Sequence, residues 1–138
     1  MLYRLQDGEG QGFKPKAIML MIGTNNTGRS SPPEIAEAIG AIILEMRKDF
    51  PNAKILLLGI FPRGNPGDPA RKTVLDANPI IAKLHDGKNV FYLDIGDKFL
   101  QPDGSLTKEI MPDFLHLSAK GYQIWADAIS PKLAELMK

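Results

Sequence analysis

The chain contains no cysteine among its 138 residues. Disulfide bonds, thiolate catalysis and cysteine-ligated zinc are therefore excluded as sources of structure or activity. The absence also fits a reducing compartment, which favours a cytoplasmic location. Residues 1–7 do not have the pattern of a signal peptide, although a leader on a longer chain would not be visible here.

The chain also lacks an excess of either charge, because 17 Lys and Arg residues balance 16 Asp and Glu residues. Such a chain has no electrostatic attraction to nucleic acid or to an acidic membrane surface, so we expect no nucleic-acid partner. No apolar run reaches the roughly 18 residues that a membrane span requires. The length fits a single domain over residues 1–138 with a core of its own.

Three short apolar runs, residues 17–22, 55–61 and 90–95, predict buried strands. Each run is nearly continuous rather than alternating, which is typical of parallel strands covered by helices on both faces. Helical patterns alternate with these runs. One starts at the capping box Ser31-Pro32-Pro33-Glu34, a second covers residues 72–84 with Gly87 as its expected C-terminal cap, and a third starts at Ser118. This alternation predicts a layered α/β fold with a parallel sheet.

Asp113 and His116 precede the last helix and are the most informative pair of residues in the chain. The carboxylate can hold one ring nitrogen and leave the other free to take a proton, as a general base requires. The alternative is a surface turn with a local hydrogen bond and no chemistry. Two ligands are too few for a zinc site, so we expect no metal and no cofactor. His85, the other histidine, is interpreted as structural.

A second polar cluster, Gly23-Thr24-Asn25-Asn26, follows the first predicted strand and could supply an oxyanion donor. Ligands of parallel α/β folds bind at the carboxyl ends of strands, so this cluster and the Asp113–His116 pair can meet at one rim of the sheet. Asn25 could instead be only a turn residue. Arg63 lies on a rim loop and is interpreted as a solvated arginine, with contact to a substrate as the alternative.

None of the five serines is placed as a nucleophile for such a site. Ser31 and Ser118 are interpreted as helix caps, whose hydroxyls face backbone N–H groups. The others are Ser30, Ser105 and Ser130.

These motifs together resemble the SGNH (GDSL-type) hydrolases. Residues 18–27 and 57–64 are similar to the platelet-activating-factor acetylhydrolase branch and its bacterial relatives. The resemblance implies a three-layer, flavodoxin-like sheet and hydrolysis of acetyl or other short acyl esters. It implies that His116 is the base, that Asp113 orients it and that Asn25 is the oxyanion donor. Gly23, Asn26 and Arg63 would then lie near the substrate.

The resemblance also implies a strand ending in Gly-Asp-Ser and a second block with a further oxyanion N–H, and neither is found in residues 1–138. We therefore expect a member of the family that is truncated at the N-terminus, with a sheet incomplete on that side and no activity as this chain alone. Whether the chain is an enzyme stays open. The alternative is a non-catalytic, self-associating domain that keeps the hydrolase scaffold.

The missing strand would pair, in the family's sheet, beside residues 17–22. Its absence leaves an unpaired strand edge, and such edges are templates for another chain. We therefore expect a homodimer or a higher oligomer, formed through this edge.

Overall fold

The computed structural model describes residues 1–138. Its centre is a parallel sheet of three strands, β1 (Ala17–Leu20), β2 (Lys54–Leu58) and β3 (Val90–Leu93), in the order β1-β2-β3. The three predicted strands are confirmed, although each ends two or three residues earlier than expected. β1 and β3 are the two edges of the sheet.

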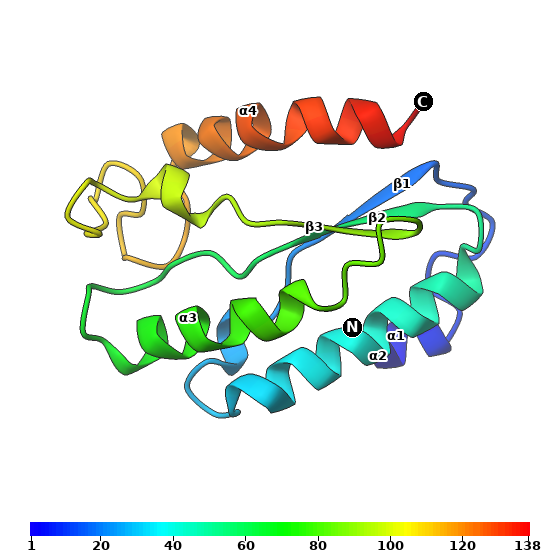
Figure 1. Ribbon diagram of the computed structural model, residues 1–138, viewed down its shortest axis with the longest axis horizontal. Coiled ribbons are helices and arrows are strands. Elements are labelled where there is room, and N and C mark those ends of the chain that lie inside the picture. The colour runs from blue at the N-terminus through cyan, green and yellow to red at the C-terminus, as the bar shows by residue number, and fades with distance from the viewer.

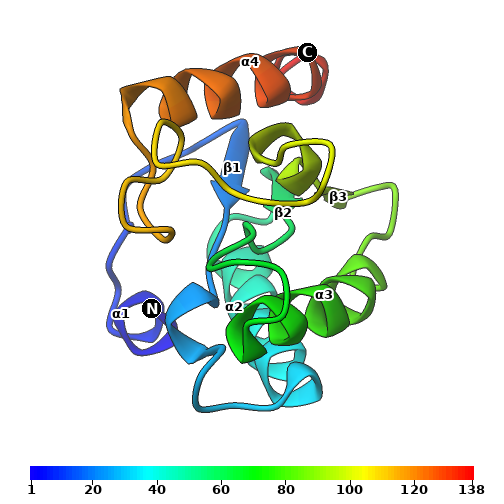
Figure 2. The same ribbon diagram turned by 90° about the vertical axis from the view of Figure 1, so that its left-hand side faces the viewer.

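Four helices cover this sheet from both sides. α1 (Leu2–Gln6), α2 (Pro32–Asp49) and α3 (Pro69–Ala82) lie on one side, and α4 (Ala119–Leu136) lies on the other (Figures 1 and 2). The predicted three-layer α/β fold is confirmed.

Side-chain caps start two of these helices as the sequence predicts. Ser31 and Glu34 form the reciprocal capping box of α2, with Glu34 accepting from the Ser31 backbone N–H at 2.8 Å. The Ser118 hydroxyl accepts from the Gly121 N–H at the start of α4. Both contacts satisfy backbone donors that have no partner inside the helix.

The predicted boundaries of the middle helix are wrong at both ends. α3 begins at Pro69, because proline at the first helical position has its φ fixed for a helix and needs no N–H partner. It ends at Ala82, so Gly87 does not cap it. Gly87, at φ 68°, instead lies in the turn that leads into β3 and donates its N–H to the Val90 carbonyl.

Successive residues of β2 supply the two halves of the core. Ile55 and Leu57 pack among side chains of α2 and α3, whereas Leu56 and Leu58 pack against α4. All four are at most 1% exposed. Because both faces of β2 are covered, its sequence is continuously apolar.

β1 is less well covered than β2. Met19 is 39% exposed, whereas Leu56, its partner on β2, is fully buried. β1 pairs with β2 on one side and with no strand on the other.

No helix is both long and apolar enough to cross a bilayer.

Candidate functional site

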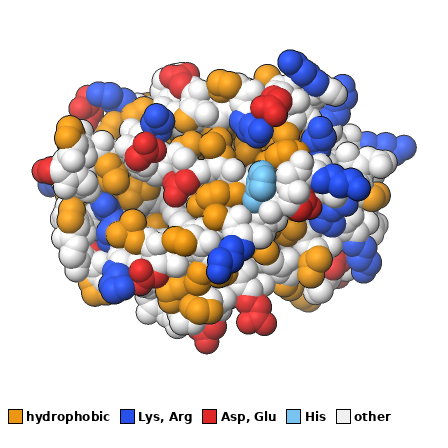
Figure 3. Space-filling view, viewed as in Figure 1, with side chains coloured by type: hydrophobic (Ala, Val, Ile, Leu, Met, Phe, Trp, Pro, Cys, Tyr) orange, Lys and Arg blue, Asp and Glu red, His pale blue; other side chains and the backbone are white.

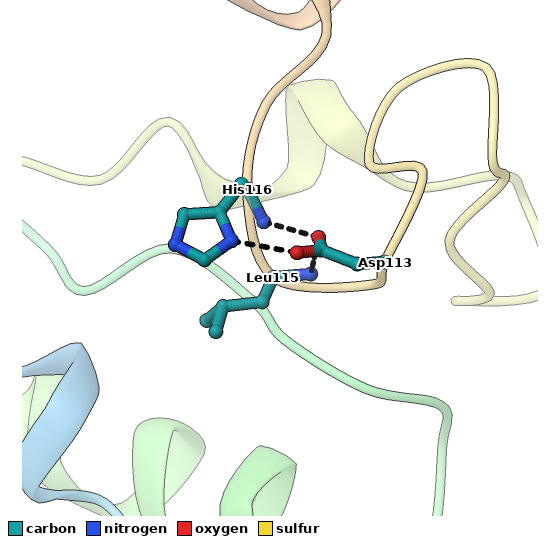
Figure 4. Close-up of polar contacts among 3 residues, drawn as sticks. All are labelled: Asp113, Leu115 and His116. Carbon is teal, nitrogen blue, oxygen red and sulfur yellow. Dashed lines mark hydrogen bonds and ion pairs between the residues drawn. The ribbon is translucent and has the colours of Figure 1, made fainter.

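The Asp113–His116 turn forms the hydrogen bond that the sequence predicts. Oδ2 of Asp113 lies 2.6 Å from Nδ1 of His116 (Figure 4). Oδ1 of the same carboxylate accepts from the backbone N–H groups of Leu115 at 3.0 Å and His116 at 2.7 Å. A carboxylate beside Nδ1 favours the proton on that nitrogen, which leaves Nε2 free to accept one.

These contacts also set the charge of Asp113. The hydrogen bond to the His116 ring, followed by those from the backbone N–H groups of His116 and Leu115, holds the pKa of the carboxyl far below its ordinary value of 3.8. Hydrogen bonds to the charged form of an acid stabilise that form. Asp113 is therefore ionised at neutral pH and can stabilise a positive charge on the ring.

The turn between these residues has unusual backbone geometry. Phe114 has φ 59° and is the one non-glycine residue of the chain with a positive φ. Its carbonyl accepts from the Gly64 N–H at 2.8 Å. Strained backbone of this kind persists only where surrounding contacts hold it, and here the contact comes from the loop after β2.

Gly23 gives the second polar cluster its shape. Its φ is 117°, and an added Cβ would lie 2.9 Å from Cδ1 of Ile60. Glycine is therefore required where the chain leaves β1 and enters the short 3₁₀ turn Thr24–Asn26. The side chain of Asn25, in the middle of this turn, is exposed.

A cavity of about 230 Å³ brings Asn25, Arg63 and His116 together. Asn25 and His116 therefore lie at the same rim of the sheet, as the sequence predicts. Apolar and aromatic side chains form the rest of the wall: Met21, Phe61, Pro62, Leu115, Leu117, Tyr122 and Trp125.

Gly23 and Asn26 do not line this cavity. They line a neighbouring one of about 520 Å³, which lies between the end of β1 and helices α1 and α2. Met21, Thr24 and Asn25 line both cavities, so the Asn25 turn separates them.

None of the five serines lines the cavity that contains His116. Ser118 is only two residues from His116 in sequence, but its hydroxyl donates to the Glu109 carbonyl at 2.6 Å and caps α4. Ser31 caps α2, and Ser105 donates to Asp103. The interpretation of Ser31 and Ser118 as caps is confirmed.

Arg63 is not a solvated loop residue, so that interpretation is wrong. It is half-buried, and its Nη1 donates to the Thr24 carbonyl at 2.9 Å and to the Thr27 hydroxyl at 3.2 Å. These two acceptors flank the turn that carries Asn25. His85 is away from the site, where its Nδ1 accepts from the Tyr92 N–H at 3.0 Å, and its structural interpretation is confirmed.

Tyr122, Trp125 and Arg71 received no site role from the sequence. Tyr122 and Trp125 belong to the helix predicted to start at Ser118, and their rings stack 5.9 Å apart and form a wall of the cavity. Their spacing of three residues just after His116 was the available signal. Arg71 was placed outside a helix predicted to start at residue 72, yet it is 5% exposed and hydrogen-bonded to the loop after β2. Pro69 was the signal for that earlier helix start.

Charged side chains of both signs lie on one face of the molecule. Lys and Arg side chains are interspersed with Asp and Glu on the face shown in Figure 3.

Comparison with known protein families gives a match along most of the chain. The model of the GDSL-like Lipase/Acylhydrolase family matches residues 1–124. The chain is 37% identical over 123 residues to platelet-activating factor acetylhydrolase IB subunit alpha2 of Gallus gallus, covering 88% of this chain and 53% of the relative. It is 31% identical over 138 residues to the human alpha1 subunit, covering 99% of this chain and 59% of the relative. The chain thus spans little more than half the length of these curated relatives.

Solved structures share the same fold. A structure from Streptococcus pneumonia, described as a platelet activating factor, superposes with a TM-score of 0.81 at 27% identity, covering 95% of this chain and 66% of that one. Est24, a carbohydrate acetylesterase from Sinorhizobium meliloti, superposes with a TM-score of 0.74 at 23% identity, covering 98% and 67%. The second likeness concerns the fold alone.

Proposed function

The chain belongs to the GDSL-like lipase/acylhydrolase family, and we propose that it supplies the general base and an oxyanion donor of an enzyme that hydrolyses acetyl or other short acyl esters. One observation carries the proposal. His116, held at Nδ1 by Asp113 at 2.6 Å, lines the same cavity as Asn25. A base and an amide donor at one cavity are the elements that acyl transfer requires beside a nucleophile.

Each residue has a defined part in the proposed reaction. Nε2 of His116 takes the proton from a serine hydroxyl as the serine attacks the ester carbonyl, and later returns it to the leaving alcohol. Asp113 keeps the ring in the required tautomer and stabilises the imidazolium. The Asn25 amide donates to the oxyanion of the tetrahedral intermediate, where a single donor is worth roughly 3–4 kcal/mol of barrier.

The serine itself must come from outside the residues of this domain, since all five serines lie away from the cavity. The cavity of about 520 Å³ next to the open edge of β1 offers space for a segment that carries it, because Asn25 lies between this space and the His116 cavity. Gly23 and Asn26 would then face that segment. Residues 1–138 form one domain in this proposal and have no esterase activity alone.

The size of the His116 cavity supports a small acyl group. About 230 Å³ with apolar and aromatic walls is below the roughly 300–1,000 Å³ typical of pockets for drug-sized ligands. An acetyl or other short acyl chain fits such a volume. The acetyl group in the names of the curated relatives agrees with this size.

A second candidate function is favoured by one observation, the unpaired edge of β1. An apolar edge with an exposed Met19 is a surface on which a second copy of the chain can add a strand. In this alternative the chain is a self-associating domain that keeps the hydrolase scaffold without its chemistry.

Incubation of the purified chain with p-nitrophenyl acetate and with a fluorophosphonate that labels reactive serines tests the absence of a nucleophile. We expect no covalent label by mass spectrometry and the same ester turnover from the chain and from its His116→Ala variant. Labelling of any of the five serines, lost in His116→Ala, would show that the nucleophile lies within the chain.

A further inference from the structure

We propose that Arg63 and Arg71 are positioning residues that act in series. Arg63 holds the turn that carries Asn25. Arg71 holds the loop that contains Arg63, and a backbone N–H of the same loop contacts the His116 turn. The inference rests on the proposed function, because it concerns how the oxyanion donor and the base are kept at one cavity.

The first link joins Arg63 to the Asn25 turn. Nη1 of Arg63 donates to the Thr24 carbonyl at 2.9 Å and to the Thr27 hydroxyl at 3.2 Å. The Thr27 hydroxyl in turn donates to the Thr24 carbonyl at 2.8 Å, and Thr27 is 5% exposed. Asn25 lies between these two residues with an exposed side chain, so the direction of its amide depends on the backbone that Arg63 holds.

The second link joins Arg71 to the loop after β2. Its three guanidinium nitrogens each donate to a different carbonyl: Nε to Arg63 at 3.0 Å, Nη2 to Gly64 at 2.7 Å and Nη1 to Gly104 at 2.9 Å. Arg71 is 5% exposed and lies in the first turn of α3. A buried guanidinium is stable only when its donors are satisfied, so these three bonds hold the loop against a helix.

The third link joins the same loop to the His116 turn. The Gly64 N–H donates to the carbonyl of Phe114 at 2.8 Å, at the one position where a non-glycine backbone has positive φ. Phe114 follows Asp113, so this contact supports the strained part of the turn. The short loop 62–64 therefore contacts both the Asn25 turn and the His116 turn.

The two arginines differ in the chemistry they use, and this difference allows a sharp test. Arg63 makes both of its bonds from one nitrogen, which a lysine ammonium can replace. Arg71 uses three nitrogens in a planar fork, which lysine cannot replace. A lysine at position 63 should therefore preserve the site, whereas a lysine at position 71 should not.

Residue-resolved amide hydrogen exchange of the intact chain, measured by NMR, tests the proposal without any substrate. In Arg63→Met the amides of Asn26 and Thr27 should exchange about tenfold faster, while the sheet amides of Ile55 and Gly59 keep their rates. Arg63→Lys should restore rates near those of the unsubstituted chain. Arg29→Met, which removes an exposed arginine near the same turn, is the matched control and should change neither set.

Arg71→Lys should accelerate exchange at both turns, at Asn26 and Thr27 and also at Leu115 and His116. Because this variant removes buried bonds and could fail to fold, the unsubstituted chain provides a second measurement. The Arg71 Nε–H should exchange much more slowly than the Nε–H of exposed Arg29. Equal rates for these two groups would overturn the proposed role of Arg71.

The Arg63 arm is overturned by any of three results: unchanged exchange at Asn26 and Thr27 in Arg63→Met, equal acceleration of the sheet amides, or failure of Arg63→Lys to restore the rates. These outcomes are independent of ester hydrolysis. If the exchange rates change as expected but the chain does not support ester hydrolysis, the proposed function is refuted and the positioning roles of the two arginines stand.

Discussion

Asp113 is joined to His116 twice, by Oδ2 to the ring Nδ1 at 2.6 Å and by Oδ1 to the backbone N–H at 2.7 Å. One carboxylate therefore fixes both the ring and the backbone of the turn. Removal of its charge should weaken both contacts together.

Acid should weaken this turn only at a pH well below 3.8. The pKa of Asp113 in the fold is far below its ordinary value of 3.8, so its stabilising contribution is present above that value and is lost as the pH falls toward the lower one. In an NMR titration from pH 6 to 2, the His116 amide should therefore keep its signal position down to pH 3.8 and begin to change only below that value. Asp113→Asn, which can still accept a hydrogen bond but does not titrate there, should abolish this change. A midpoint at or above 3.8 would contradict the account.

Asn78 should be important for the end of β2 that leads into the site. Its buried amide accepts from the Ile60 N–H at 2.8 Å and donates to the Ile60 carbonyl at 3.0 Å. Asn78→Ala leaves both backbone groups buried without a partner, so we expect a loss of about 2–4 kcal/mol in the free energy of unfolding. Urea denaturation measures this loss. The exposed amide of Gln123 provides the control, and Gln123→Ala should cost no more than about 0.5 kcal/mol.

Self-association through β1 should depend on Met19, which is 39% exposed on the unpaired strand. We expect light scattering to show a dimer or a higher oligomer at micromolar concentration, and Met19→Lys to shift it toward monomer, because a charge at an exposed edge disfavours strand addition. Leu44→Lys, which alters a side chain on α2 that is 73% exposed, should leave the assembly unchanged. A monomeric unsubstituted chain would reject association, and an oligomer insensitive to Met19→Lys would reject this geometry.

The fold could be predicted from the sequence because its signals are local. Continuous apolar runs such as residues 55–58 and caps such as Ser31 and Ser118 act within a few residues of themselves. The Asp113–His116 hydrogen bond was predictable for the same reason, since its partners are three residues apart.

The supports of the site could not be predicted, because they join distant segments. Arg63 and Thr24 are 39 residues apart, and Arg71 and Gly104 are 33 apart. Nothing local distinguishes an arginine that will be buried by such a contact from one that remains in water. The positive φ of Phe114 could not be predicted either, because aromatic residues rarely adopt a positive φ.

The central claim is that His116 is the base of an ester hydrolase whose serine lies outside this domain. The most direct measurement joins residues 1–138 to the part of the Gallus gallus alpha2 subunit that this chain does not match, and follows p-nitrophenyl acetate hydrolysis. We expect turnover that falls by about 10³-fold or more in His116→Ala, since triad members act as a unit, and that is retained in the control His85→Ala. An active fusion that hydrolyses the ester equally well with and without the His116 imidazole would contradict the account.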